Sequence, residues 1–254
     1  MRRMATRAQA QSFDRLAAGY DRLGELAGDD RIGSWLAGLL PASGRSALDL
    51  GCGSGRHSVL LAERFEQVDA VDISLPMIEL ATARRPRPNI TYSTADLQDV
   101  AGSGRYDFVL SALTLHHVPD LHRALTHIKM LVAPGGRLVV ADMYDSDSPG
   151  GFAHRVRGAV RRVVPLRLRL RALAVQALAA NIARRGPATA WQIYRLSTRA
   201  EWLDHRVADL FFSRAELERS CEALFPGHRF DTLGGVRGVG LIWDAPVSAA
   251  GSSG

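Results

Sequence analysis

The sequence predicts an α/β fold: a doubly wound sheet of seven strands with helices on both faces and a C-terminal antiparallel hairpin. Three observations predict it. Short apolar runs alternate with segments of helical periodicity, which indicates a βαβ rhythm. These runs are continuously apolar, as in parallel strands that are buried on both faces. The last two runs are joined by a loop that is too short for a helical crossover.

Each element follows from its local pattern. Five runs have the length and the Val, Ile and Leu content of buried strands, namely Ala47–Leu50, Val68–Val71, Ile90–Tyr92, Phe108–Leu110 and Leu138–Val140. Helical periodicity marks the segments His57–Phe65, Met77–Arg84, Leu121–Leu131 and Arg214–Leu224. The runs Arg229–Leu233 and Val239–Trp243 flank a short Gly-rich loop, so we expect them to pair as a hairpin.

The composition indicates a globular chain that needs neither disulfides nor a metal. The chain has 254 residues, of which 46% are hydrophobic, enough for a sizeable core. Its net charge is +6, but 31 of the 32 basic residues are arginines spread along most of the chain, as expected from a GC-rich genome. Cys52 and Cys221 are far apart and lack the paired spacing of a zinc site. With no leader-like or membrane-spanning apolar run, we expect a cytoplasmic protein.

A glycine-rich loop follows the first predicted strand. The stretch LDLGCGSGR, residues 48–56, contains Gly51, Gly53 and Gly55. A dinucleotide-binding loop needs a further glycine in a G-x-G-x-x-G pattern, and Arg56 occupies that position. The phosphate-binding pattern that ends in Gly-Lys-Ser/Thr is absent as well. Both phosphate-binding interpretations are therefore weakened.

Two carboxylates favour a cationic ligand instead. Asp49 stands at the strand end beside the loop, where it would repel a pyrophosphate and attract a positive charge. Asp72 ends the second strand, 21 residues after Gly51, where a carboxylate can accept hydrogen bonds from both ribose hydroxyls. Taken alone, Asp72 would equally suit a helix N-cap or a turn. Together with the loop, the two acids predict a nucleoside that carries an amino group and a sulfonium.

Five motifs resemble those of class I S-adenosylmethionine-dependent methyltransferases. They are ALDLGCGSG, VDAVDIS, ADLQD, YDFVLSALTLHHV and LVAPGGRLVV, and they cover roughly residues 47–142. The N-terminal SFDRLAAGYD also resembles the lid of the bacterial small-molecule branch of this family. The resemblance implies a Rossmann-like fold and S-adenosyl-L-methionine as the cofactor, with S-adenosyl-L-homocysteine as the product.

The resemblance also implies which residues hold the methionine part of the cofactor. Asp49 and Gly51 would bind its amino group, while Gly53 and Gly55 would shape the loop around it. Ser111, at the end of the fourth strand, would lie beside it.

The nucleoside part would be held by residues after the second and third strands. Asp72 would bind the ribose, and Ile73 and Met77 would flank the adenine. Asp96 would accept from the exocyclic amine of the adenine, and Leu97 would supply a backbone contact.

The family pattern divides the chain into five regions. They are an N-terminal helical lid at 1–45, the cofactor-binding core at 46–145, an Arg-rich helical insertion over the substrate site at 146–210, the final helix and hairpin at 211–246 and a disordered tail at 247–254. Tyr20 in the lid would close over the cofactor, with a plain core aromatic as the alternative. The insertion has no Asp or Glu from Ser148 to Ala200. Its alternating stretch Leu166–Arg171 fits either a helix or an extended segment.

His116 and His117 are the catalytic candidates. They follow the fourth strand directly, at the mouth where the methyl group should point, and histidine titrates near neutral pH. His117 is the first choice as general base or substrate-positioning group. The alternative is a turn typical of the family, in which the two imidazoles hydrogen-bond within the fold. Weaker candidates for a substrate pocket lie in or after the insertion, unless they only pack it onto the sheet: His154, Trp191, Tyr194, Trp202 and His205.

The expected activity is methyl transfer to O, N or C of a small molecule, as in specialised metabolism. Methylation of amino groups in nucleic acids is disfavoured. Enzymes with that activity carry an Asn/Asp-Pro-Pro-aromatic motif after the fourth strand, where this chain has the sequence that begins at Ser111. The basic insertion keeps a lipid or quinone substrate at a membrane surface open as an alternative, although a solvated lid face is favoured. A non-methylating cofactor-binding protein is another alternative. The expected partners are thus a small-molecule methyl acceptor and no nucleic acid; membrane association is disfavoured, and a homodimer is left open.

Overall fold

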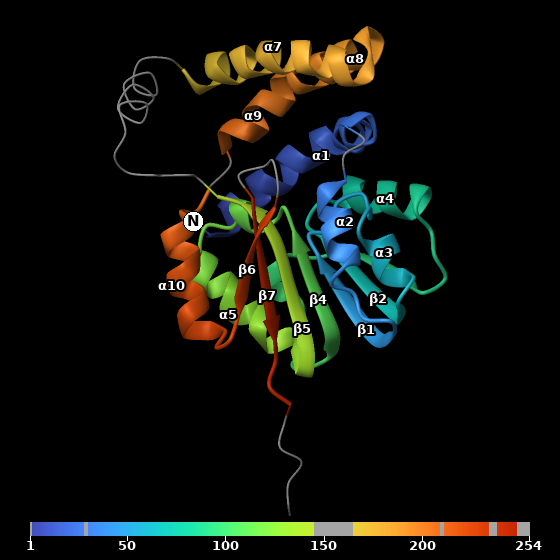
Figure 1. The fold of residues 1–254 in the computed structure, drawn as a ribbon, viewed down its shortest axis with the longest axis vertical. Coiled ribbons are helices and arrows are strands. Elements are labelled where there is room, and N and C mark those ends of the chain that lie inside the picture. Colours follow the sequence, from blue (N-terminus) through green and yellow to red (C-terminus); the bar gives the residue numbers. More distant parts are fainter. Residues whose placement is uncertain (1, 28–29, 145–164, 209–210, 234–237, 248–254) are drawn as a thin grey trace, which may run out of the picture. The chain divides into compact units, whose positions relative to one another are not determined.

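A computed structural model of the chain describes residues 2–27, 30–144, 165–208, 211–233 and 238–247 (Figure 1). These residues form two compact units. One combines Asp30–Ser146 with Leu210–Gly254 and contains the sheet, and the other combines Met1–Asp29 with Asp147–Asp209 and contains helices. Each unit is described by itself below.

The sheet has seven strands in the order β3-β2-β1-β4-β5-β7-β6, which confirms the predicted fold class (Figure 1). The strands are β1 (Gly44–Leu50), β2 (Phe65–Asp72), β3 (Ile90–Thr94), β4 (Tyr106–Ala112), β5 (Val132–Met143), β6 (Arg229–Leu233) and β7 (Gly238–Asp244). The first five pair in parallel, while β7 runs antiparallel to both β5 and β6. The order reverses between β1 and β4, and this reversal creates the switch point at which open α/β sheets bind ligands.

Helices cover both faces of the sheet, as predicted. The helices of this unit are α2 (Arg31–Ala37), α3 (Ser58–Ala62), α4 (Leu75–Arg84), α5 (Leu121–Leu131) and α10 (Arg214–Leu224), with short 3-10 turns η1 (Leu97–Asp99) and η2 (Leu115–His117). Four of the helices begin at capping side chains: Asp30, Ser74, Asp120 and Ser213 accept hydrogen bonds from the backbone N–H three residues later.

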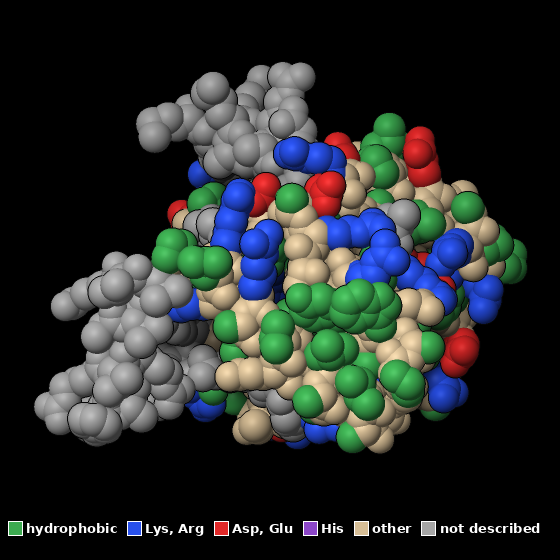
Figure 2. Space-filling model, turned by 90° about the horizontal axis from the view of Figure 1, so that it is seen from above, with side chains coloured by type: hydrophobic (Ala, Val, Ile, Leu, Met, Phe, Trp, Pro, Cys, Tyr) green, Lys and Arg blue, Asp and Glu red, His purple; other side chains and the backbone are tan. Residues whose placement is uncertain are grey.

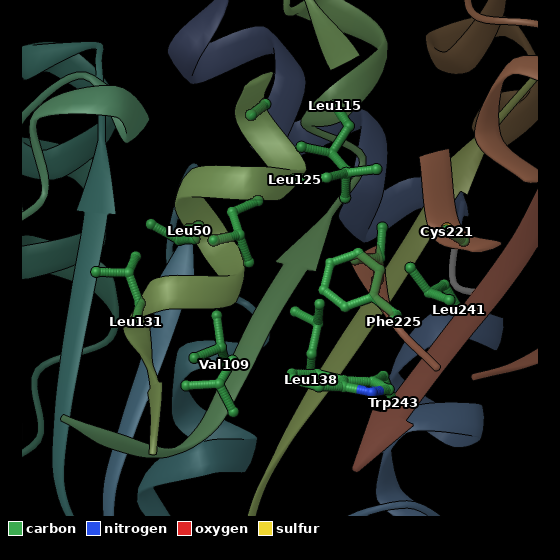
Figure 3. Packing of buried hydrophobic residues seen from close by; sticks show 14 of the residues in the cluster. Leu50, Val109, Leu115, Leu125, Leu131, Leu138, Cys221, Phe225, Leu241 and Trp243 are labelled. Atoms are coloured by element: carbon green, nitrogen blue, oxygen red, sulfur yellow. The ribbon is translucent and has the colours of Figure 1, made fainter. Parts of the chain in front are cut away.

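The sheet alternates its side chains between two apolar clusters. Leu48 and Leu50 of β1 pack with α5 and α10, and Figure 3 shows this cluster, in which Leu125 of α5 and Phe225 after α10 lie over the sheet. Ala47 points to the opposite cluster, which includes Leu36 of α2 and Leu61 of α3. This period of two buries both faces and explains why the strands are apolar throughout.

The helix predicted at His57–Phe65 is shorter than expected. It ends at Ala62, and Phe65 is already the first residue of β2. The side chain of Phe65 is buried, and its ring centroid lies 5.6 Å from that of Phe108 in β4. This long-range aromatic contact favours the strand conformation over the local helical pattern.

The helical unit consists of α1 (Arg2–Ala27), α7 (Leu166–Arg185), α8 (Pro187–Ser197) and α9 (Ala200–Ala208). The alternating stretch from Leu166 is therefore helical. Gly186, at φ +79°, separates α7 from α8, which begins at the following proline. Within the unit, the Arg185 guanidinium donates to the Leu26 carbonyl at 3.3 Å. The tail predicted at 247–254 lies outside the described residues except for Val247.

Candidate functional site

The glycine loop after β1 is tied to β2 at the switch point. The backbone N–H groups of Gly51 and Cys52 both donate to the Val71 carbonyl, at 2.8 and 3.0 Å. Gly51, Gly53 and Gly55 have φ values of +73°, +53° and +79°, which favour glycine. The loop therefore needs glycine for its backbone conformation at each of these positions.

The three glycines differ in what surrounds them. A Cβ on Gly51 would overlap the Thr114 side chain, and a Cβ on Gly55 would lie 2.6 Å from the Tyr92 hydroxyl. A Cβ on Gly53 would meet nothing within 4 Å. Gly51 and Gly55 are thus required by packing, whereas Gly53 borders open space. The space at Gly53 would let a ligand come close to the loop backbone, and a side chain at this position would block that approach.

Asp49 is a buried carboxylate beneath this loop. Its side chain is about 1% exposed, and the Ser58 hydroxyl donates to Oδ2 at 2.6 Å. Burial raises the pKa of Asp49, and the hydrogen bond from Ser58 opposes this only in part. A charged carboxylate at this position therefore favours a cationic group nearby, as expected for an ammonium ligand.

Asp72 connects the loop to the end of β2. Oδ2 accepts from the Gly53 N–H at 2.8 Å, and Oδ1 accepts from the Ser74 N–H at 2.9 Å. The N-cap of α4 is Ser74, so Asp72 does not act as the cap. These two bonds fix the Asp72 carboxylate at the carboxyl end of β2, beside the glycine loop.

The candidates for the adenine region lie at the ends of β2 and β3. The Ala95 N–H donates to the Asp72 carbonyl at 3.0 Å and so joins these two strand ends. Asp96 caps η1 by accepting from the Gln98 N–H at 2.9 Å. The side chains of Met77 and Leu97 are buried, and Ile73 is half-buried.

Ser111 at the end of β4 has a buried hydroxyl without a hydrogen bond. Its side chain is fully buried, and Oγ has no partner within the described part of the chain. It lies level with Leu50 of β1 and Val140 of β5, at the carboxyl ends of the strands. An unpaired buried hydroxyl costs free energy. After the glycine loop, Ser111 is therefore a second place where a polar group of a ligand would gain a hydrogen bond.

The segment after β4 turns sharply over the sheet edge. Leu113 has φ +55°, the one positive value at a non-glycine among the described residues, which costs roughly 1–2 kcal/mol. Its N–H donates to the Ala141 carbonyl at 2.8 Å. This turn places the Thr114 hydroxyl 3.3 Å from the Leu50 carbonyl and starts η2 beside the glycine loop. Backbone strain of this kind is typical of functional sites.

The two histidine candidates have different environments. His116 is about 4% exposed, and its Nδ1 lies 2.6 Å from Oδ1 of Asp142, which is fully buried at the end of β5. His117 is half-buried, and its ring centroid lies 3.9 Å from that of His116. On the other side, Phe211 stacks on His116 with centroids 5.3 Å apart. His116 is thus an imidazole fixed by a buried carboxylate.

Asp142 was missed by the sequence reasoning. Besides His116, it accepts from the backbone N–H groups of Thr114, Leu115 and Met143, at 3.2, 2.7 and 2.6 Å. A carboxylate with three backbone donors serves as the acceptor, so we infer that the proton of His116 lies on Nδ1 and the lone pair on Nε2. An acid within the buried run LVVADM at a strand end was the available signal.

The remaining candidates belong to the helical unit. The ring centroid of Tyr20 lies 5.8 Å from that of Trp202, which in turn lies 6.1 Å from that of His205. Trp191 and Tyr194 stack at 5.3 Å. His154 lies outside the described residues. The roles expected for these side chains at the cofactor or substrate stay predictions.

Comparisons with known proteins identify the domain. Residues 48–140 match the model of a methyltransferase domain. An uncharacterised methyltransferase of Mycobacterium tuberculosis strain H37Rv is 34% identical over 121 residues, which are 47% of this chain and 61% of the relative. The 27-O-demethylrifamycin SV methyltransferase of Amycolatopsis mediterranei is 31% identical over 144 residues, 53% of each chain. The chain thus spans between half and two thirds of these relatives.

A solved structure extends the likeness to nearly the whole chain. The complex of DhpI with SAH has a TM-score of 0.61 at 18% identity and covers 95% of this chain and 97% of that one, which shows a shared fold. Among the described residues, no group of three His, Cys, Asp or Glu side chains is arranged to hold a metal ion. The glycine loop and the acids at the strand ends lie within residues 48–140, and this segment of the chain is a methyltransferase domain.

Proposed function

We propose that this chain transfers a methyl group from S-adenosyl-L-methionine to a small molecule of specialised metabolism, and that the acceptor atom is a hydroxyl oxygen. The pairing of His116 with Asp142 carries this proposal. A hydroxyl must lose its proton on methylation, so a base is useful there, whereas an unprotonated amine attacks with its own lone pair. The rifamycin relative, whose name describes methylation at an oxygen, supports the same atom type.

The residues around the glycine loop fit the cofactor. Asp49 would balance its ammonium group, and Gly51 and Gly55 would hold the loop open at Gly53. Ser111 has the unpaired hydroxyl to donate to a carboxylate or accept from an amine.

The nucleoside would be held from the neighbouring strand ends. Asp72, which is fixed beside the glycine loop, would accept from the ribose hydroxyls, with Asp96 and the Leu97 backbone at the adenine edge. Ile73 and the buried Met77 would provide its apolar surface. Tyr20 would close the site as part of the lid.

When bound, the cofactor supplies a methyl group that its sulfonium already activates. The task of the protein is then to hold the acceptor in line and exclude water. Nε2 of His116 would take the hydroxyl proton as the oxygen forms its new bond to carbon and the bond from carbon to sulfur breaks. Asp142 would hold the resulting imidazolium. His117, at 3.9 Å between ring centroids, would help position the acceptor.

The experiment is label transfer into fractionated cell extract. The chain is incubated with cofactor labelled in its methyl group and with extract separated into small molecules, lipids, protein and RNA. We expect the label in the small-molecule fraction together with S-adenosyl-L-homocysteine, and we expect the product to be a methyl ether. Label in protein or RNA would contradict the substrate class. Cofactor binding by calorimetry without transfer to any fraction would identify a non-methylating protein.

His116→Gln and His117→Gln then form a matched pair of variants. With the methyl acceptor found in the extract, His116→Gln should lower turnover at least tenfold while cofactor affinity stays unchanged. His117→Gln should mainly raise KM. Equal turnover in both variants would contradict the assignment of the base but not the methyl transfer itself.

A further inference from the structure

Helix α7 has an exposed apolar stripe that no helix or strand of the described residues covers. Its three members Leu168, Val175 and Ile182 are spaced by seven residues and are 53%, 55% and 44% exposed. On an α-helix this spacing places them on one face, together with the exposed Ala172 and Ala179 between them. No residue of α7 is buried, although the helix has 20 residues. A surface helix normally buries its apolar side, so this stripe predicts a partner.

The segment of the sequence that contains α7 and α8 is strongly basic. The segment 148–200 contains 11 of the 32 basic residues and none of the 26 acidic ones, which leaves the rest of the chain with 21 basic against 26 acidic residues. The whole positive excess of the protein is therefore concentrated in this segment. Arg171 and Arg184 of α7 are exposed and form no ion pair within the described residues, whereas Arg167 pairs with Asp204. A concentrated cationic surface attracts an anionic partner.

Apolar and cationic side chains are mixed on this surface. Figure 2 shows the face that includes α7 and α8, where hydrophobic and Arg side chains lie next to each other. Leu166 and Leu173 are exposed on a different side of α7 from the stripe, and Trp191 at the start of α8 is 52% exposed. Amphipathic helices that lie in a membrane interface combine these residue types, with Trp at headgroup depth.

We propose that α7 and the start of α8 dock on the surface of a membrane that contains anionic lipids. A second copy of this chain fits less well, because two surfaces with the same excess of positive charge would repel each other. None of the helices that the structure describes is long and apolar enough to cross a membrane, so the contact is with the surface. The structure thus favours a membrane contact over the solvated lid face that the sequence favoured, and it does so independently of which acceptor is methylated.

The test is co-sedimentation of the full chain with vesicles. Phosphatidylcholine vesicles are compared with vesicles that contain phosphatidylglycerol, each at 50 mM and 500 mM salt. We expect binding to the anionic vesicles only, with an affinity at least tenfold lower at the higher salt, because salt screens the charges. Absence of binding to anionic vesicles at low salt would overturn the proposal, as would equal binding to both lipid compositions.

Matched variants locate the contact. Val175→Glu/Ile182→Glu places charges in the stripe, and Arg171→Glu/Arg184→Glu reverses two positive charges of α7, one beside the stripe and one on the side of Leu173. Each pair should lower vesicle binding at least tenfold. The control is Leu75→Glu/Met130→Glu, which changes two exposed apolar residues on α4 and α5 and should bind like the wild type.

Circular dichroism of each variant checks that its helices are intact, and all substituted residues are exposed. Equal loss in the control pair, or full binding by both α7 variants, would overturn the location on α7. Sedimentation velocity without vesicles measures whether the protein forms a dimer. A dimer that dissociates on Val175→Glu/Ile182→Glu would show that the stripe binds a second copy, and this would overturn the membrane contact.

Discussion

Nδ1 of His116 lies 2.6 Å from Oδ1 of Asp142, although the two residues are 26 positions apart in the chain. One follows β4 and the other ends β5, and these strands are neighbours in the sheet. The pairing brings a carboxylate and an imidazole together at the carboxyl ends of the strands, beside the glycine loop. It orients the ring and selects which nitrogen carries the proton.

Asp142→Asn is expected to reverse the tautomer of His116. The amide would donate to Nδ1, which moves the ring proton to Nε2 and removes the acceptor that a hydroxyl substrate needs. Long-range 15N correlation spectra should show an unprotonated Nε2 in the wild type and an unprotonated Nδ1 in the variant. Turnover should fall, and unfolding should become easier by about 1–3 kcal/mol, because one backbone donor loses its acceptor. Identical spectra would contradict the selection of the tautomer by Asp142.

Gly53→Ala should reduce cofactor affinity more than stability. A methyl group at this position meets nothing in the protein, so the folding cost is that of the positive φ, about 1–2 kcal/mol. The added methyl group would occupy the space next to the loop. We therefore expect the dissociation constant of the cofactor, measured by calorimetry, to rise at least tenfold. Gly227→Ala is the control, because Gly227 also has a positive φ and open surroundings but lies before β6. Equal affinity in the two variants would show that the cofactor does not approach Gly53.

Asp72→Ala should weaken cofactor binding by about 1.5–3 kcal/mol, since hydrogen bonds to a charged group are lost. It should also lower the melting temperature, because the Gly53 and Ser74 N–H groups lose their acceptor. Asp69→Ala separates the two effects. Asp69 lies in the same strand and accepts from the Tyr106 hydroxyl at 2.8 Å, so its loss should reduce stability alone. Unchanged calorimetric affinity in Asp72→Ala would contradict the ribose assignment.

Cofactor affinity should fall at acidic pH because of Asp49. Burial raises the pKa of its carboxyl, so it takes up a proton at a higher pH than an exposed aspartate would. Once protonated, it can no longer balance the ammonium group, and the dissociation constant should rise as the pH is lowered from 8 to 5. Titration calorimetry across this range measures the effect. Asp49→Asn should bind weakly throughout and lack this pH dependence, and a pH dependence as large as that of the wild type would assign it to another group.

The same raised pKa has a consequence for folding. The charged form of Asp49 is less stable in the folded protein than in the unfolded chain, so its contribution opposes folding above the unfolded pKa of about 3.8 and disappears below it. Cofactor binding should therefore stabilise the protein most at neutral pH, where the ammonium compensates this charge. Melting temperatures with and without cofactor measure this difference.

Local patterns in the sequence were enough to predict the succession of strands and helices along the chain, the hairpin and the glycine loop. The hydrophobic period and the turn residues on which these predictions rest depend only on neighbouring residues. The motifs around Asp49 and Asp72 also identified the cofactor family, since each lies at the end of a strand that the pattern marks. Where the local pattern was wrong, at Phe65, a contact with the distant Phe108 overrides it.

Only the tertiary structure showed that a carboxylate holds His116. Asp142 reaches His116 because β4 and β5 pair in parallel, and no spacing along the chain encodes that distance. The helical state of the stretch from Leu166, which the sequence left open, also follows from the fold. Exposure of the stripe on α7 depends on which sides α8 and α9 cover, so a pattern of Leu and Arg cannot reveal it.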